Sequence, residues 1–99
     1  MLKQVHCYIK GDVIGVGFRA WTKIQAKMLK VNGWVKNNFE RPEIFGDYGG
    51  VEAVFQGDEE QLEKMIQLVK QGPPISYVED VDYFYEEVKK IYDSFEIKK

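Results

Sequence analysis

The stretch "QVHCYIKGDVIGVGFRAWTKIQAKMLKVNG", residues 4–33, predicts a strand, a glycine-rich loop and a helix in succession. Its first part alternates apolar and polar residues, with Val5, Cys7 and Ile9 on one face, which predicts a strand. Residues 19–31 then carry apolar side chains at helical spacing, which predicts an amphipathic helix that Asn32 or Gly33 ends. The apolar side chains at that spacing are Ala20, Ile24, Met28 and Val31. Between strand and helix lies a glycine-rich loop, residues 11–18.

The rest of the chain supplies one more helix and several strands. Residues 34–39 and 51–56 have the composition of strands, and residues 40–50 between them, with Pro42 and three glycines, are expected to form a loop. Residues 57–72 predict the second helix, which Asp58 caps and Gly72 ends. Residues 75–85 predict a fourth strand and residues 94–99 a short fifth one.

The order of these elements predicts an α+β fold in a single domain, residues 1–99. Two βαβ units that share one sheet give a ferredoxin-like split βαβ sandwich, βαββαβ. We expect a four-stranded antiparallel sheet with two helices on one face, plus a short C-terminal strand. In that topology the first two strands are parallel, with the third between them, so residues 11–18 and Asn37 can meet at one end.

Composition excludes several classes of function. The 99 residues include one cysteine and one histidine, which rules out an internal disulfide and argues against a structural zinc site. No apolar run reaches transmembrane length, and no signal-peptide core begins the chain, so we expect a cytoplasmic protein without a membrane partner.

Charge is distributed unevenly along the chain. Residues 1–39 hold seven Lys or Arg and one acid, and residues 40–99 hold seven Lys or Arg and fifteen acids, which gives +6 and −8 for the total of −2. This acidic balance argues against nucleic-acid binding, and an RNA-binding sandwich is disfavoured because the strand aromatics lie among acids.

The glycine loop and Arg19 have the properties of an anion site. Glycines allow backbone N–H groups to turn inward, and a helix start leaves its first N–H groups without partners. No Ser, Thr, Asp or Asn lies between Ile14 and Ala20 to cap the helix. Arg19, in the first turn, could grip two phosphate oxygens. A plain strand-to-helix turn with a surface arginine remains the alternative at this point.

Two signatures together make the chain resemble a known family. "GDVIGVGFR", residues 11–19, resembles the acylphosphatase signature G-x-V-Q-G-V-x-F-R. "GWVKN", residues 33–37, is similar to the second signature of that family, and "VEAVFQG", "KQGPP" and "SFEIKK" are similar to later parts of its pattern.

The resemblance implies an enzyme that hydrolyses the carboxyl-phosphate anhydride of a small acyl phosphate to a carboxylate and inorganic phosphate, without metal or cofactor. Arg19 would bind the phosphoryl group together with backbone N–H groups, and Asn37 would orient the attacking water. The residues that would supply those N–H groups are Gly15, Val16, Gly17 and Phe18. The alternative is a non-catalytic phosphate-binding or regulatory module on the same fold. A short, lysine-tipped last strand favours a monomer.

The chain departs from the family pattern at two places. Ile14 replaces the usual glutamine of the loop, and the segment between Asn37 and Val51 is longer than usual. That extension, residues 38–50, is either a partial lid to which Arg41 adds positive charge, or an exposed hairpin without a role. His6 shows no partner in the sequence pattern and is expected to be structural or exposed.

Overall fold

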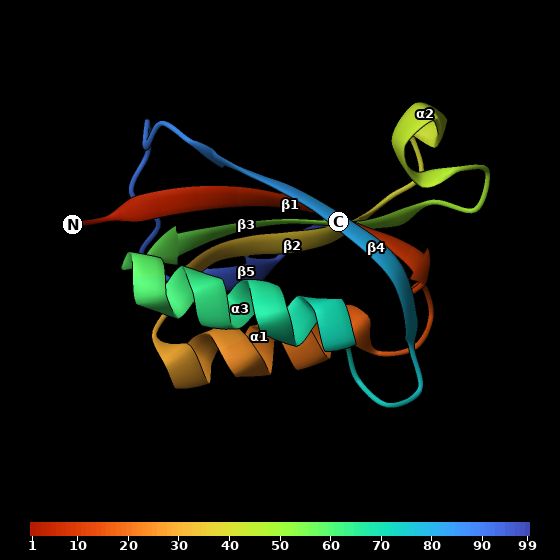
Figure 1. Ribbon diagram of the computed structural model, residues 1–99, viewed down its shortest axis with the longest axis horizontal. Coiled ribbons are helices and arrows are strands. Elements are labelled where there is room, and N and C mark those ends of the chain that lie inside the picture. The colour runs from red at the N-terminus through yellow and green to blue at the C-terminus, as the bar shows by residue number, and fades with distance from the viewer.

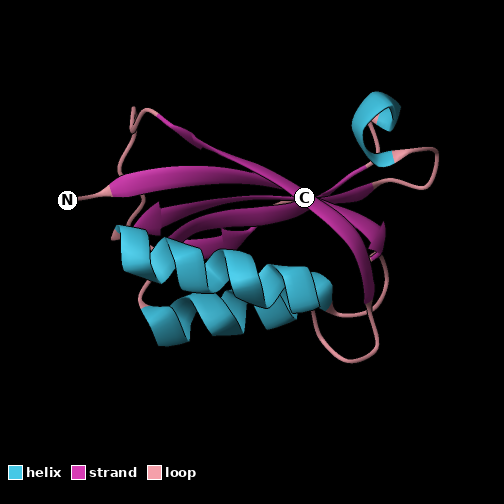
Figure 2. Cartoon of the chain, in the orientation of Figure 1, coloured by secondary structure: helices cyan, strands magenta, loops and turns pink.

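The computed structural model describes residues 1–99 as one twisted sheet with two long helices on one face (Figures 1 and 2). The strands are β1 (Lys3–Asp12), β2 (Asn32–Asn38), β3 (Gly50–Gly57), β4 (Tyr77–Glu86) and β5 (Phe95–Ile97). The helices are α1 (Phe18–Leu29), α2 (Pro42–Phe45) and α3 (Glu59–Gln71). The sheet order is β4-β1-β3-β2-β5. This confirms the ferredoxin-like prediction and places β3 between β1 and β2.

The fifth strand extends the sheet beyond the four predicted antiparallel strands. β5 pairs parallel with β2, from Gly33 opposite Phe95 to Val35 opposite Ile97, whereas the other pairs are antiparallel. The backbone N–H of Lys98 adds a hydrogen bond to the carbonyl oxygen of Val35 at 2.8 Å. β2 is therefore bonded on both sides rather than left at an edge.

The core lies between the sheet and the two long helices. Seventeen buried residues form it, among them Val5, Cys7 and Ile9, as their alternation predicts. Burial raises the pKa of the Cys7 thiol to about 12, because the low-dielectric core disfavours the thiolate. Cys7 is therefore a small core side chain rather than a nucleophile at neutral pH.

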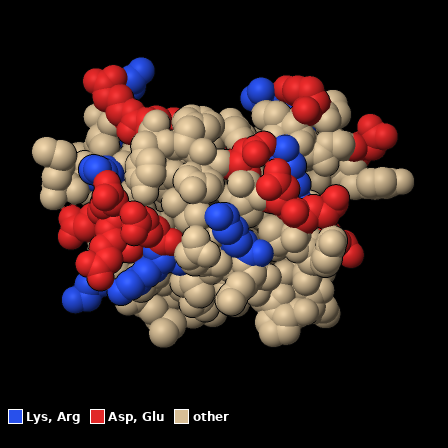
Figure 3. Space-filling view, viewed as in Figure 1, with Lys and Arg blue, Asp and Glu red and all other residues tan.

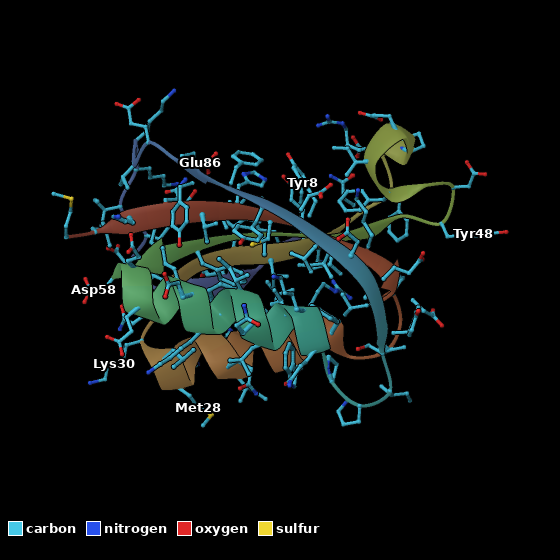
Figure 4. The ribbon with its side chains drawn as sticks, in the orientation of Figure 1. Tyr8, Met28, Lys30, Tyr48, Asp58 and Glu86 are labelled. Atoms are coloured by element: carbon cyan, nitrogen blue, oxygen red, sulfur yellow. The ribbon has the colours of Figure 1, made fainter.

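Helix α3 is capped as the sequence predicts. The Asp58 side chain and the N3 residue Gln61 form a capping box, in which the Asp58 N–H donates to Gln61 Oε1 at 2.8 Å. The buried face of α3 carries Leu62, Met65, Ile66 and Val69, and Gly72 ends the helix. Figure 4 shows Asp58 at the start of this helix.

Helix α1 presents a different face to the core from the one predicted. Ile24 is 57% exposed and Met28 is 73% exposed, and Figure 4 shows Met28 pointing away from the sheet. The buried face carries Phe18, Thr22 and Ala26. A threonine fits the core here because its hydroxyl donates to the Phe18 carbonyl oxygen at 2.8 Å, which leaves no unpaired polar group.

The end of α1 also differs from the prediction. Lys30, with φ 60°, ends the helix, and β2 begins at Asn32 rather than at Trp34. Gly33 lies within β2 at φ 139°, where a Cβ atom would overlap the carbonyl oxygen of Val54. This glycine therefore permits a close approach of two strands and does not act as a helix stop.

The sheet face opposite the long helices, which we call the open face, is partly covered by two segments. The connection between β4 and β5 crosses it, since Gln56 Nε2 donates to the Lys90 carbonyl and the Tyr92 N–H donates to Gln56 Oε1. The predicted loop 40–50 contains the one-turn helix α2, whose Phe45 packs edge-on against Tyr8, with ring centroids 5.7 Å apart. Both Tyr8 and Glu86 lie on this side of the sheet in Figure 4.

Candidate active site

The loop between β1 and α1 has the backbone conformation that its glycines allow. Gly15 and Gly17 adopt φ values of 75° and 76°, in the left-handed region that other residues avoid. Gly17 is the N-cap residue of α1, and no side chain caps this helix end. Val16 and Phe18 pack toward the core, so the loop presents its backbone rather than its side chains.

The N–H groups of this loop have no acceptors within the protein. The first backbone hydrogen bond of α1 runs from the Trp21 N–H to the Gly17 carbonyl at 3.0 Å, and none is donated by residues 15–20. These groups add to the positive end of the helix dipole. The loop therefore offers a set of unpaired donors to an anion.

Arg19 and Asn37 lie beside these donors. Both line a pocket of about 190 Å³, which we call the loop pocket, together with Gly15, Gly17 and Phe18. Neither the Arg19 guanidinium nor the Asn37 carboxamide hydrogen-bonds or forms an ion pair with another protein group. The structure thus brings Arg19, Asn37 and the glycine loop to one end of the sheet, as the topology predicts.

Asn37 is placed by the pairing of its strand. It lies opposite Val51 of β3, and paired residues share a sheet face, so its side chain lies on the face that carries α1. Val51 belongs to the buried core. The carboxamide is therefore fixed relative to the start of α1 by a rigid strand rather than by a loop.

The two departures from the family pattern lie outside the loop pocket. Ile14 packs against the hydrophobic core and does not line the pocket, so an apolar residue is accommodated in place of glutamine. Arg41 does not line the pocket, and its guanidinium pairs with Glu43. Mutual attraction raises the pKa of Arg41 and lowers that of Glu43, chiefly through their side-chain hydrogen bond.

His6 has partners that the sequence pattern does not reveal. Its Nε2 lies 2.6 Å from Glu52 Oε2, and its Nδ1 lies 3.3 Å from Glu86 Oε2. The ring stacks on Phe84 with centroids 5.3 Å apart. His6 belongs to the open face, since it alternates with Val5 and Cys7, and it is therefore separated from the loop pocket by the sheet. Strand register alone could have paired it with Phe84, but not with the two carboxylates.

Other features of the molecule offer no competing catalytic centre. The largest surface pocket, about 640 Å³, is lined by outward-facing residues of α3 and by Leu29, without a nucleophile or an acid–base pair of suitable geometry. No group of three or more His, Cys, Asp or Glu side chains could hold a metal ion. None of the helices combines the length and the apolar character needed to cross a membrane.

Comparisons with known proteins agree with this geometry. The family model for acylphosphatase matches residues 5–97. An acylphosphatase from Picrophilus torridus is 43% identical over 88 residues, covering 89% of this chain and 93% of the relative. One from Syntrophus aciditrophicus is 41% identical over 97 residues, covering 98% of this chain and 93% of the relative.

The fold of the chain also matches that of a solved acylphosphatase. The crystal structure of an acylphosphatase from Bacillus subtilis superposes with a TM-score of 0.85 at 33% identity, covering the whole of both chains. The family match spans the β1–α1 loop, Arg19 and Asn37, as well as the strands that bring them together. This chain therefore belongs to the acylphosphatase family.

Proposed function

We propose that this protein hydrolyses acyl phosphates at the loop pocket, with the phosphoryl group bound by the N–H groups of residues 15–18 and by Arg19. The observation that carries the proposal is the meeting of unpaired backbone donors, an unpaired guanidinium and an unpaired carboxamide around one pocket. Charge-assisted hydrogen bonds of this kind contribute about 1.5–3 kcal/mol each.

The reaction is a transfer of the phosphoryl group to water. The water oxygen bonds to phosphorus as the bond from phosphorus to the acyl oxygen breaks, and the carboxylate leaves with the electron pair. Backbone donors and Arg19 stabilise the charge on the equatorial oxygens, as phosphoryl transfer requires. A phosphate oxygen of the substrate takes the proton of the water, because no general base lines the pocket.

Asn37 has a separate role in this proposal. An amide does not act as a base near neutral pH, but its oxygen can hold a water molecule in line with phosphorus, which removes part of the entropic barrier. Asn37 pairs with Val51 of β3, and residues 33–35 before it also pair with β5. This anchoring supports the role, since an in-line water must be held to within a fraction of an ångström.

We further propose that the protein acts as a monomeric, single-domain enzyme in the cytoplasm, without a metal or a nucleic-acid partner. The two sheet edges support the monomer. β4 carries the acids Glu79, Asp80, Asp82 and Glu86, and β5 has only three residues followed by two lysines. Charged and short edge strands disfavour edge-to-edge pairing. Light scattering on a size-exclusion column would test the oligomeric state.

The experiment that tests the function is hydrolysis of acetyl phosphate and benzoyl phosphate, with and without a chelator. We expect turnover that the chelator leaves unchanged and that inorganic phosphate inhibits. Arg19→Gln should abolish both turnover and phosphate binding, measured by calorimetry. Asn37→Ala should lower kcat by about 10²–10³-fold and leave phosphate binding intact.

The matched control is Lys23→Gln, which removes a cation one turn further along α1, outside the pocket. It should leave kcat unchanged. Phosphate binding without turnover in the unmodified protein would show that the protein is a phosphate-binding module rather than an enzyme. Equal phosphate binding by the Arg19 and Asn37 variants would overturn the division of roles between these residues.

A further inference from the structure

A second groove adjoins the loop pocket and is strongly basic. Its volume is about 350 Å³, and it shares Arg19 and Asn37 with the loop pocket. Its other cationic lining residues are Lys36, Lys98 and Lys99, and Glu40 is the one carboxylate side chain among them. We call Lys36, Lys98 and Lys99 the lysine rim.

Two of the three lysines of the rim contact a buried aromatic ring. Lys98 Nζ lies 4.5 Å and Lys36 Nζ 5.7 Å from the ring centroid of Trp34. Trp34 is 9% exposed, and its indole N–H donates to the Tyr92 hydroxyl at 3.2 Å. Trp34 alternates with Val35 and packs against His6, so these contacts hold the two ammonium groups on the open-face side of β2, across the strand from the Asn37 side chain. From there the two charges act on an anion at long range rather than by contact.

The charges of the rim are largely uncompensated. Lys98 and Lys99 form no ion pair, and the one partner of Lys36 is Glu52, at 3.9 Å from Nζ to Oε1. Glu40 forms no ion pair either. The side chains that line the groove therefore carry an excess of positive charge, to which the unpaired Arg19 guanidinium adds.

Most of the negative charges of the sheet lie at the edge away from the lysine rim. β4, which carries four acids, forms one edge of the sheet, and β5, which pairs with β2, forms the other. Figure 3 shows acidic side chains gathered along β4 and over the start of α3. An approaching anion is therefore repelled from the β4 edge and attracted toward the β5 edge, where the lysine rim lies.

We propose that the lysine rim collects anions for the loop pocket and thereby selects acyl phosphates by total negative charge. This inference rests on the proposed function and names the substrates that it favours, namely acyl phosphates whose acyl part carries a second anionic group. The rim acts on approach and on ground-state binding, so it raises kcat/KM and leaves kcat unchanged. It requires no contact between the rim and the reacting atoms.

The test compares substrates that differ in charge, acetyl phosphate and succinyl phosphate, in the Lys98→Gln/Lys99→Gln variant. At about 20 mM ionic strength the variant should lose roughly fivefold in kcat/KM for succinyl phosphate and roughly twofold for acetyl phosphate, as expected for exposed charges. Both losses should disappear near about 0.5 M NaCl, where screening is short-ranged. The kcat values should not change.

The chain offers a matched control in Lys89→Gln/Lys90→Gln. This is also a pair of adjacent lysines, one of which, Lys90, lies 5.5 Å from an aromatic ring centroid, that of Tyr92. This control removes the same number of positive charges at a site outside the groove. The control should leave the ratio of the two kcat/KM values as in the unmodified protein. An equal loss in both double variants would overturn the inference, since net charge alone would then explain it.

A binding measurement separates this inference from the proposed function. The dissociation constants of acetyl phosphonate and succinyl phosphonate, which cannot be hydrolysed in this way, are measured by calorimetry for the same proteins. Tighter binding of succinyl phosphonate that depends on the rim supports the inference even if no acyl phosphate is turned over. Turnover of acyl phosphates with equal binding of both phosphonates would leave the proposed function intact and overturn the role of the rim.

Discussion

The imidazole Nε2 of His6 lies 2.6 Å from a carboxylate oxygen of Glu52, on the face of the sheet that α1 and α3 leave open. The side chains are only 15% and 12% exposed. Glu52 also accepts a hydrogen bond from Asn38 Nδ2 at 2.9 Å and lies 3.9 Å from Lys36 Nζ. One largely buried carboxylate thus joins β1 to the end of β2, next to Asn37.

Replacement of Glu52 by Ala should destabilise the protein by about 1–3 kcal/mol, because half-buried polar groups of His6 and Asn38 lose their partner. The free energy of unfolding in urea measures this loss. Glu43→Ala, which removes a partner of the exposed Arg41, is the control and should change stability by less than about 1 kcal/mol. Equal losses in the two variants would show that the network contributes nothing beyond a surface pair.

Gly17→Ala should weaken phosphate binding as well as the fold. A Cβ at Gly17 meets no atom within 4 Å, so the substitution acts through its φ of 76°, which costs about 1–2 kcal/mol for an L-residue. Relief of that strain would move the N–H groups of the loop. Gly46→Ala is the control, since Gly46 has φ 79° and equally open surroundings, remote from the loop pocket. Calorimetry should show weaker phosphate binding for the first variant only.

The part of the extension that lines neither the loop pocket nor the basic groove, residues 41–48, should have little influence on access to the loop pocket. Its helix α2 packs Phe45, which is 9% exposed, against Tyr8 of the open face. Replacement of residues 41–48 by a short glycine-containing turn should therefore lower stability by about 1.5–3 kcal/mol, the value of one buried aromatic side chain. The values of kcat and KM for acetyl phosphate should stay within about twofold. A change in KM that differs among acyl phosphates would instead support a lid.

Alkaline pH should destabilise the protein through Cys7. Its pKa is raised to about 12 in the core, against an ordinary value of 9.0, so the folded state holds the proton more tightly than the unfolded state. Stability is therefore fully present below about pH 9 and is lost as pH rises toward 12, by up to about 1.4 kcal/mol per pH unit. Urea unfolding at several pH values should show a shallower alkaline decline in Cys7→Ala. Identical declines would contradict this assignment.

Local signals predicted the elements that are determined locally. The capping box of α3 uses Asp58 and Gln61, three residues apart, and its buried stripe is uniformly apolar. The alternation of Val5, Cys7 and Ile9 fixed the buried face of β1 in the same way. The meeting of Asn37 with the glycine loop followed from topology, because the order of strands determines which loops share an end.

Prediction from periodicity was wrong for α1, since two stripes of this helix have helical spacing. The stripe with Ile24 and Met28 is the more apolar of the two, yet the stripe that contains Thr22 is buried in the core. Burial of Thr22 is possible because its hydroxyl donates a hydrogen bond to the Phe18 carbonyl. The partners of His6 come from β3 and β4, and the cover of the open face comes from the β4–β5 connection. Contacts between residues so far apart in the sequence depend on the assembled sheet and leave no periodic signal in the sequence.

The two long helices begin in opposite ways, and this has a thermodynamic consequence. Asp58 and Gln61 complete the first turn of α3 from within the chain, whereas α1 starts at Gly17 without a capping side chain. An oxyanion that accepts from the amides of residues 15–18 would complete the first turn of α1 as Asp58 completes that of α3. By mass action such a ligand would raise the melting temperature with its concentration, and the thermal stability of this protein would then depend in part on the phosphate content of its surroundings.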